Sequence, residues 1–239
     1  MSRLIAVWIA AAIGIAATVS LGNWQTRRGD QKLALQAQAV HAERGPPLVI
    51  APTSSSIEAV ATQLPRRVRL TGVFDPTGTV YLDNRTLEGV AGLYVITPLA
   101  IGEGLPAVLI DRGWMARDMQ DRQRVSAPPP AADRVTVEGI AVARPSMLFE
   151  LGDSSAHRVP GLWHNLDYAA YERVTGRSVA RFVVRQSAQS GPDDGLRRQW
   201  PQPATGVEKH RGYAFQWYSL AALIAAFAAW GSWKLWPPR

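Results

Sequence analysis

The chain has 239 residues, 47% of them hydrophobic, with a formal net charge of +7 and no cysteine. The lack of cysteine excludes a disulfide scaffold, a Cys-x-x-Cys redox site and a thiolate copper carrier. Residues 24–210 hold all but four of the 26 basic residues and all 19 acidic ones, so charge nearly balances there. The positive charge therefore does not indicate a nucleic-acid partner.

Two apolar runs without charged residues lie near the chain ends, at residues 4–22 and 212–233. As a helix the second run would be about 33 Å long, enough to cross a hydrocarbon core. The first run could be a cleaved signal peptide or a permanent anchor. We favour the anchor, because the run is longer than a typical signal core and lacks an obvious small-x-small cleavage site. We therefore predict transmembrane helices at 4–22 and 212–233.

Charge at the chain ends favours cytoplasmic positions for residues 1–3 and 234–239, which carry Arg3, Lys234 and Arg239. Arg27, Arg28 and Lys32 follow the first run and argue for the opposite orientation. Long loops cross membranes largely regardless of charge, so we expect the middle of the chain outside the cytoplasm. No amphipathic, Ser-rich and Arg-rich presequence is present, which favours a bacterial inner membrane with the domain in the periplasm.

Helix-forming residues continue past the first run and predict a juxtamembrane helical extension over 23–43. Residues 44–56, RGPPLVIAPTSSS, are interpreted as an irregular linker, and 187–206 as a turn-rich tether to the second run. Between them, period-two patterns predict six strands, RVRLTGVF, TVYLDNR, LYVITPLAI, AVLIDRGW, RVTVEGIAV and ARFVVRQ. A short helix is expected over 167–176, with Gly176 as its stop.

The predicted fold class is thus a membrane α-helical hairpin of two transmembrane helices. It encloses an α+β, mainly antiparallel β, extracytoplasmic domain over residues 44–211, with a sheet that could be curled. The 189 residues between the two runs are enough for one domain with a sizeable core.

Enzyme chemistry is not visible in the sequence, which has no G-x-S-x-G, H-E-x-x-H or G-x-x-x-x-G-K motif. His157 and His164 could form a metal site with Asp153 or Asp167, but their spacing matches no known ligand pattern. We interpret this segment as an ordinary polar surface loop. An enzyme is the least favoured class of function.

Several motifs together resemble one family. LGNWQTRRGDQK follows the first apolar run, GLYVITPL precedes VLIDRGW, GLWHNLD comes next, and HRGYAFQWYSLA opens the second run. In this order they resemble the Surfeit locus protein 1 family over essentially the whole chain. Two residues depart from that pattern. Gln31 stands where the family often has an aromatic residue, and Asp111 stands where an asparagine is common.

The resemblance implies a non-catalytic assembly factor for a heme-copper oxidase, cytochrome c oxidase. Its bacterial members are linked to transient binding of heme a and its delivery to the main oxidase subunit. That subunit is the expected partner, with heme a synthase as a further candidate and lipid as the surroundings. The alternative is a cofactor-free membrane scaffold or chaperone that holds an immature oxidase subunit.

The residues themselves allow a heme site at the start of the second run. His210, Tyr213, Ala214, Trp217 and Ala221 share one helix face, where small residues would leave a slot. His210 could ligate heme iron and Trp217 could stack on the macrocycle. Lys209 and Arg211 could attract the propionates and would disfavour a protonated imidazole.

The competing interpretation of these residues is simple anchoring, because aromatic and basic side chains collect at membrane interfaces. The resemblance favours iron ligation for His210 and leaves both interpretations open for Trp217. Arg27, Arg28 and Lys32 are expected to meet lipid headgroups, with propionates or a partner subunit as the alternative. Arg112 and Trp114 are expected to be a strand-end packing pair.

Overall fold

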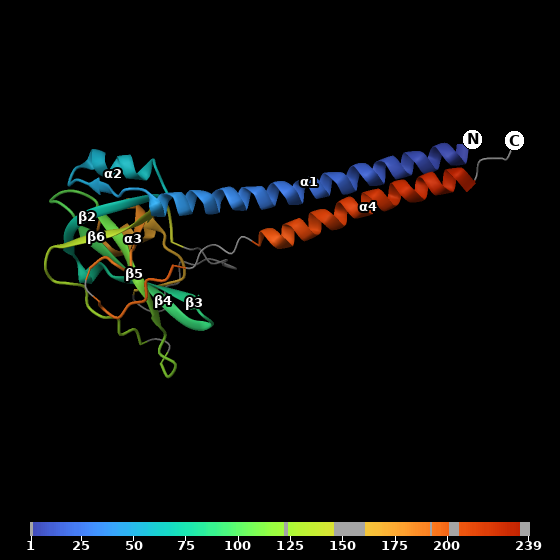
Figure 1. Ribbon diagram of the computed structural model, residues 1–239. Coiled ribbons are helices and arrows are strands. Elements are labelled where there is room, and N and C mark those ends of the chain that lie inside the picture. Colours follow the sequence, from blue (N-terminus) through green and yellow to red (C-terminus); the bar gives the residue numbers. More distant parts are fainter. Residues whose placement is uncertain (1, 122–123, 146–160, 192, 201–205, 235–239) are drawn as a thin grey trace. The chain divides into compact units, whose positions relative to one another are not determined.

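The computed structural model describes residues 2–121, 124–145, 161–191, 193–200 and 206–234. The chain divides into two compact units (Figure 1). The first, here called the helix pair, comprises Met1–Gln38 and Gln202–Arg239. The second, here called the β domain, comprises Ala39–Pro201. His157 and Asp153, considered above as metal ligands, lie outside the described residues.

The helix pair consists of α4 (Val207–Lys234) and of α1 (Ser2–Arg44) up to Gln38, which run side by side in opposite directions (Figure 1). Helix α1 continues without a break from the apolar run through the predicted extension. Both helices are long and apolar enough to cross a membrane. Only 17% of the most apolar window of each is buried, so large side chains such as Ile13 and Phe227 face outward. Such outward apolar surface is typical of helices surrounded by lipid.

The β domain is built on one eight-stranded sheet in the order β1-β2-β6-β8-β5-β4-β3-β7. The strands are β1 (Leu48–Ile50), β2 (Arg66–Phe74), β3 (Val80–Leu87), β4 (Val90–Ala100), β5 (Ala107–Ala116), β6 (Val135–Val142), β7 (Leu162–Trp163) and β8 (Val179–Gln186). Burial alternates along β2, so every second residue of the period-two pattern RVRLTGVF faces the core.

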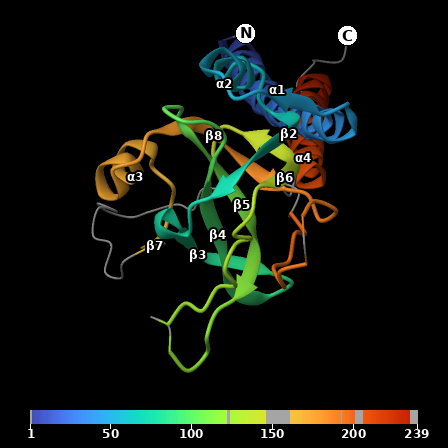
Figure 2. The same cartoon turned by 90° about the vertical axis from the view of Figure 1, so that its left-hand side faces the viewer.

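The sheet curls on itself, because β2 pairs with both β6 and β4 and so closes a ring through β8 and β5 (Figure 2). Five of the eight strand pairings are antiparallel, which confirms a mostly antiparallel, curled sheet. Val68, Leu99, Val108, Phe182 and Val184 are among the fully buried side chains of the main core cluster.

Three short elements complete the domain: α2 (Ser54–Ala61), the 3-10 turn η1 (Pro76–Gly78) and α3 (Tyr168–Thr175). Each helix starts at a side-chain cap, since Thr53 accepts from the amide of Ser56 and Asp167 from that of Ala170. Helix α3 ends at Gly176, as the sequence predicts.

Two sequence interpretations differ from the structure. Residues 44–56 are not an irregular linker, because they form β1 and the start of α2. Part of the predicted turn-rich tether, residues 193–200, packs on the β domain: Leu196 is buried, Arg197 bridges to Trp114, and the Trp200 ring lies 5.4 Å from that of Tyr94. Apolar residues at 196 and 200 cover the sheet despite the turn-rich composition around them.

Candidate functional site

The first candidate site lies at the start of α4, where His210 meets α1. His210 is in the first turn, its amide donating to the carbonyl of Gly206. Its side-chain Nδ1 lies 2.7 Å from Oε1 of Gln25 on α1. A carbonyl oxygen only accepts, so Nδ1 donates this hydrogen bond, and in the neutral imidazole Nε2 then keeps its lone pair. That tautomer is the one in which Nε2 can bind a metal.

Close packing of α1 on α4 holds this histidine in place. A Cβ added to Gly29 would lie 3.8 Å from Cβ of His210, and one added to Gly22 would lie 2.6 Å from the ring of Tyr218. The Tyr218 hydroxyl donates to Oδ1 of Asn23 at 2.8 Å. The glycines thus let the helices approach, and polar side chains of α1 bind those of α4.

The other predicted site residues on α4 differ in exposure. Ala214 and Ala221 are buried, Trp217 is half-buried, and Tyr213 is 53% exposed. Helix α1 approaches α4 closely at Gly22 and Gly29, and the small-residue slot predicted from the α4 sequence stays a prediction. Helical spacing alone cannot tell a ligand groove from a helix contact.

The basic residues beside His210 remain accessible. Lys209 and Arg211 are both exposed, and Arg211 contacts the exposed Glu208 at 3.7 Å. Such a surface ion pair is weak, so the guanidinium can exchange it for another anion. The residues at the start of α4 therefore fit a heme in part: His210 offers a lone pair, and two cations flank it.

A second candidate site is built by the Asp-Arg-Gly-Trp stretch inside β5. The β4–β5 register pairs Val95 with Gly113 and Ile96 with Asp111, so Arg112 is the extra residue of a β-bulge. Gly113 has φ +147°, and a Cβ there would lie 2.9 Å from the side chain of Leu196. The bulge and the glycine together turn Arg112 away from the ladder.

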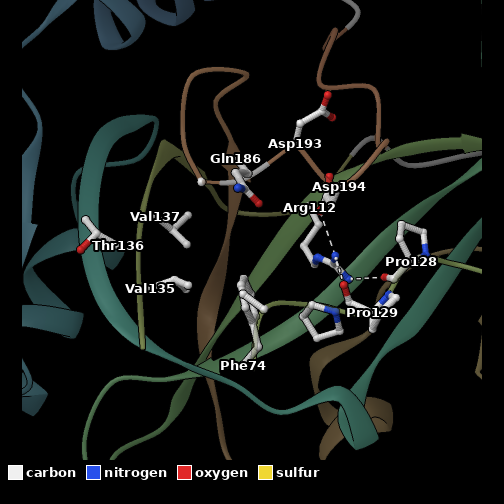
Figure 3. A pocket seen from close by; sticks show the side chains of 13 residues that line it. Phe74, Arg112, Pro128, Pro129, Val135, Thr136, Val137, Gln186, Asp193 and Asp194 are labelled. Atoms are coloured by element: carbon white, nitrogen blue, oxygen red, sulfur yellow. Dashed lines mark hydrogen bonds and ion pairs between the residues drawn. The ribbon is translucent and has the colours of Figure 1, made fainter. Parts of the chain in front are cut away.

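Arg112 is 2% exposed and forms one side of a pocket of about 330 Å³ (Figure 3). Its guanidinium donates to the carbonyls of Pro128 and Pro129 and to Oδ2 of Asp194 at 2.8 Å. Burial lowers the pKa of Arg112, and the bond to Asp194 opposes this shift. We call this cavity the Arg112 pocket; its lining also includes Phe74, Val135, Thr136, Val137, Gln186 and Asp193.

Arg112 and Trp114 are thus not the strand-end packing pair expected from the sequence. Both lie within β5. The Trp114 indole is 4% exposed and donates to the carbonyl of Arg85 at 2.6 Å, while Arg112 binds loop carbonyls and Asp194. Pro128 and Asp194 come from segments whose folded positions the sequence does not reveal.

Asp111 is completely buried, and its carboxyl oxygens accept no side-chain hydrogen bond from the described residues. Burial raises its pKa to about 8, although the charges of Arg185 and Arg85 and the amide of Gly113 act in the opposite direction. The carboxyl is therefore largely protonated at neutral pH. No cluster of three potential metal ligands occurs among the described residues.

These features define a class of protein: two long apolar helices joined to a curled β domain, with a histidine held at the start of the second helix. Comparison with known sequences makes the class specific. The model of the SURF1 family matches residues 12–222. The chain belongs to the SURF1 family, a family of cytochrome oxidase assembly factors.

Three relatives illustrate the similarity. A SURF1-like protein of Monosiga brevicollis is 25% identical over 87% of this chain and 81% of the relative. Surfeit locus protein 1 of Xenopus tropicalis is 25% identical over 90% of this chain and 72% of the relative. A SURF1-like protein of Dictyostelium discoideum is 30% identical over 44% of this chain and 41% of the relative.

Proposed function

We propose that this protein is a membrane-anchored, non-catalytic assembly factor that binds heme a through His210 and assists its insertion into the main subunit of a heme-copper oxidase. The observation that carries the proposal is the 2.7 Å contact between His210 Nδ1 and Gln25 Oε1, which leaves Nε2 free to act as a ligand. Family membership supplies the oxidase context.

In this proposal α1 and α4 form a transmembrane hairpin. Apolar side chains on the outside of the pair support it, because they would contact lipid instead of water. The basic chain ends favour cytoplasmic termini and a periplasmic β domain in a bacterial inner membrane. His210 would then lie near the interface, where an amphiphilic ligand can reach it.

Each residue at the start of α4 has a separate task. Heme a, when bound, would supply an iron that accepts the lone pair of His210 Nε2. Gln25 holds the imidazole ring and its tautomer, while exposed Lys209 and Arg211 offer positive charge to carboxylates. Tyr213 is the exposed aromatic residue beside them. Trp217 is half-buried and is given a lesser role, in positioning or in anchoring the helix.

The alternative is a cofactor-free scaffold that holds an immature oxidase subunit. The close approach of α1 to α4 at Gly22 and Gly29 favours it, because a macrocycle between the helices would have to compete with that packing. Heme a synthase is a further partner under the first proposal only, since a carrier must receive heme from its source.

Complementation in cells lacking this protein separates the two functions. Under the heme proposal, the oxidase subunit persists in these cells but carries much less heme a. Wild type restores the heme a content of the subunit, whereas His210→Ala does not. His41→Ala is the matched control, since His41 is an exposed histidine on α1. Loss of the subunit itself, rescued equally by wild type and His210→Ala, would favour the scaffold.

A further inference from the structure

The Arg112 pocket has the size of a single large side chain. Its volume of about 330 Å³ lies at the lower end of the range for ligand pockets. Phe74, Val135 and Val137 supply apolar surface, and Pro128–Pro130 form the facing wall. Figure 3 shows open space between the valines on one side and Arg112 with the prolines on the other. A compact apolar group fits this space better than an extended cofactor.

One buried acceptor in the pocket has no donor. Gln186 is 3% exposed, and its Oε1 accepts no hydrogen bond from the described residues. Its Nε2 donates to the carbonyl of Ser190 at 2.6 Å, which fixes the amide so that Oε1 cannot exchange places with Nε2. The amide extends toward the open space of the pocket (Figure 3). A buried acceptor of this kind favours an occupant that brings a donor.

The two less exposed charges of the pocket, Arg112 and Asp194, are paired with each other. Asp193 is an exposed carboxylate at the edge of the pocket, and its Oδ1 accepts from a backbone amide. Arg112 donates to Asp194 and to two carbonyls, and Asp194 also accepts from Arg198 at 2.6 Å. The Arg112 guanidinium lies over the ring of Phe74 at 5.7 Å. An anionic occupant would have to compete with Asp194, and a cationic one would lie beside buried Arg112. The occupant is therefore electrically neutral.

We propose that the Arg112 pocket binds a neutral aromatic side chain with one hydrogen-bond donor, the indole of a tryptophan, presented by a partner polypeptide. The ring packs between the valines and the prolines, and the indole N–H donates to Oε1 of Gln186. An aliphatic side chain would leave that oxygen without a partner, whereas indole has one donor and no acceptor to satisfy. This site is separate from His210 and does not depend on heme binding.

The test uses the full chain in lipid nanodiscs with ¹³C-labelled valine methyl groups, and N-acetyl-tryptophanamide as the probe. The methyl signals of Val135 and Val137 should shift saturably at millimolar probe. The 1-methyl-tryptophan analogue keeps the ring but lacks the N–H, so it should bind about tenfold more weakly. Free indole is tested as a second probe, because it lacks the peptide groups of N-acetyl-tryptophanamide. A side-chain site should bind N-acetyl-tryptophanamide, whereas a site for a small molecule could bind indole alone.

Two neighbouring alanines provide a matched pair of variants. Ala131 lines the pocket, whereas Ala132 is exposed and lies outside the lining. Ala131→Phe should fill the mouth and abolish the shifts, and Ala132→Phe should leave them unchanged. Both positions are in the same loop. A variant that fails to fold would show altered valine methyl signals even without probe, so misfolding can be told apart from a blocked pocket.

Three results would each overturn the proposal. The first is the absence of saturable shifts with N-acetyl-tryptophanamide in a protein whose spectrum is otherwise intact. The second is equal affinity for the 1-methyl analogue, which would mean that water satisfies Gln186. The third is binding of free indole without binding of N-acetyl-tryptophanamide, which would assign the pocket to a small molecule.

Discussion

At the scale of the residue, one contact between distant positions holds the imidazole of His210. Gln25 and His210 are 185 positions apart in the chain, and each alone is an ordinary polar residue near an apolar run. The family resemblance favours His210 as a ligand, but nothing in the sequence singles out Gln25. Only the packing of α1 on α4 brings the amide oxygen to the imidazole.

Gln25→Leu should allow the neutral imidazole of His210 to adopt either tautomer. Without an acceptor at Nδ1, the hydrogen can move to Nε2, so ¹⁵N NMR of histidine-labelled protein at pH 8.5 should change from an Nδ1–H pattern to a mixture. Loss of such an orienting partner typically weakens metal binding by about 10- to 100-fold, so retained heme should fall as well.

Gln31→Leu is the control for this change, since Gln31 is an exposed glutamine on the same helix. The ¹⁵N measurement needs no heme, so it tests the positioning role separately from the ligand assignment. Unchanged ¹⁵N shifts in Gln25→Leu would refute the orienting role.

Asp111→Asn should stabilise the β domain and flatten its pH dependence. The folded carboxyl has a pKa of about 8 against 3.8 for the free side chain, so the folded state binds more protons between these values. Wild-type stability should therefore fall as pH rises from about 4 to 8. The variant carries no ionisable group there and should gain about 2–5 kcal/mol at pH 8 relative to wild type.

Chemical unfolding at several pH values, followed by near-UV circular dichroism, measures this difference. At pH 4 the two proteins should be similar, because Asp111 is then protonated in the folded state and about half-protonated in the unfolded state. Equal slopes of stability against pH in both proteins would contradict the assignment of this group.

At the scale of the element, local pattern predicts the six longer strands and helices α1, α3 and α4, but not β1, β7 or α2. Period-two burial identifies β2, because every second side chain is buried. Strands β1 and β7 have only three and two residues, too few to show a period. Helix α2 starts within a serine run that resembles a loop, and only Ile57 and Val60 of its residues are buried.

The contact of α1 with α4 likewise cannot be predicted from the local sequence pattern of either helix. A cross-link tests this contact directly. The chain has no cysteine, and a Cβ at position 29 would lie 3.8 Å from Cβ of His210, within the range for a disulfide. Gly29→Cys with His210→Cys should therefore oxidise efficiently. Gly29→Cys with Lys209→Cys is the control, since Lys209 is exposed.

Adding Gly22→Leu should lower the yield of that cross-link several-fold. The new side chain would meet the Tyr218 ring, whose hydroxyl binds Asn23, so the helices must separate or the ring must leave its place. Gel mobility with and without reductant measures the yield. Equal oxidation of both cysteine pairs would mean that the helices do not hold this register.

At the scale of the whole molecule, two apolar helices at the ends of the chain require both termini on one side if both cross the membrane. We expect alkaline phosphatase fused after residue 130, within the loop before β6, to be active, because that enzyme needs a periplasmic position. A reporter that works only in the cytoplasm should be inactive at the same point. The reverse pattern would invert the orientation and place the β domain in the cytoplasm.

The most direct measurement of the central claim is the heme content of the purified protein. Full-length wild type and the variants His210→Ala and His41→Ala are made in cells that produce heme a, and heme is quantified as pyridine hemochrome on matched protein. We predict that wild type and His41→Ala retain heme a and that His210→Ala loses most of it while still inserting into the membrane. Equal heme in all three proteins, or none in wild type, would contradict the assignment of His210 as a heme ligand.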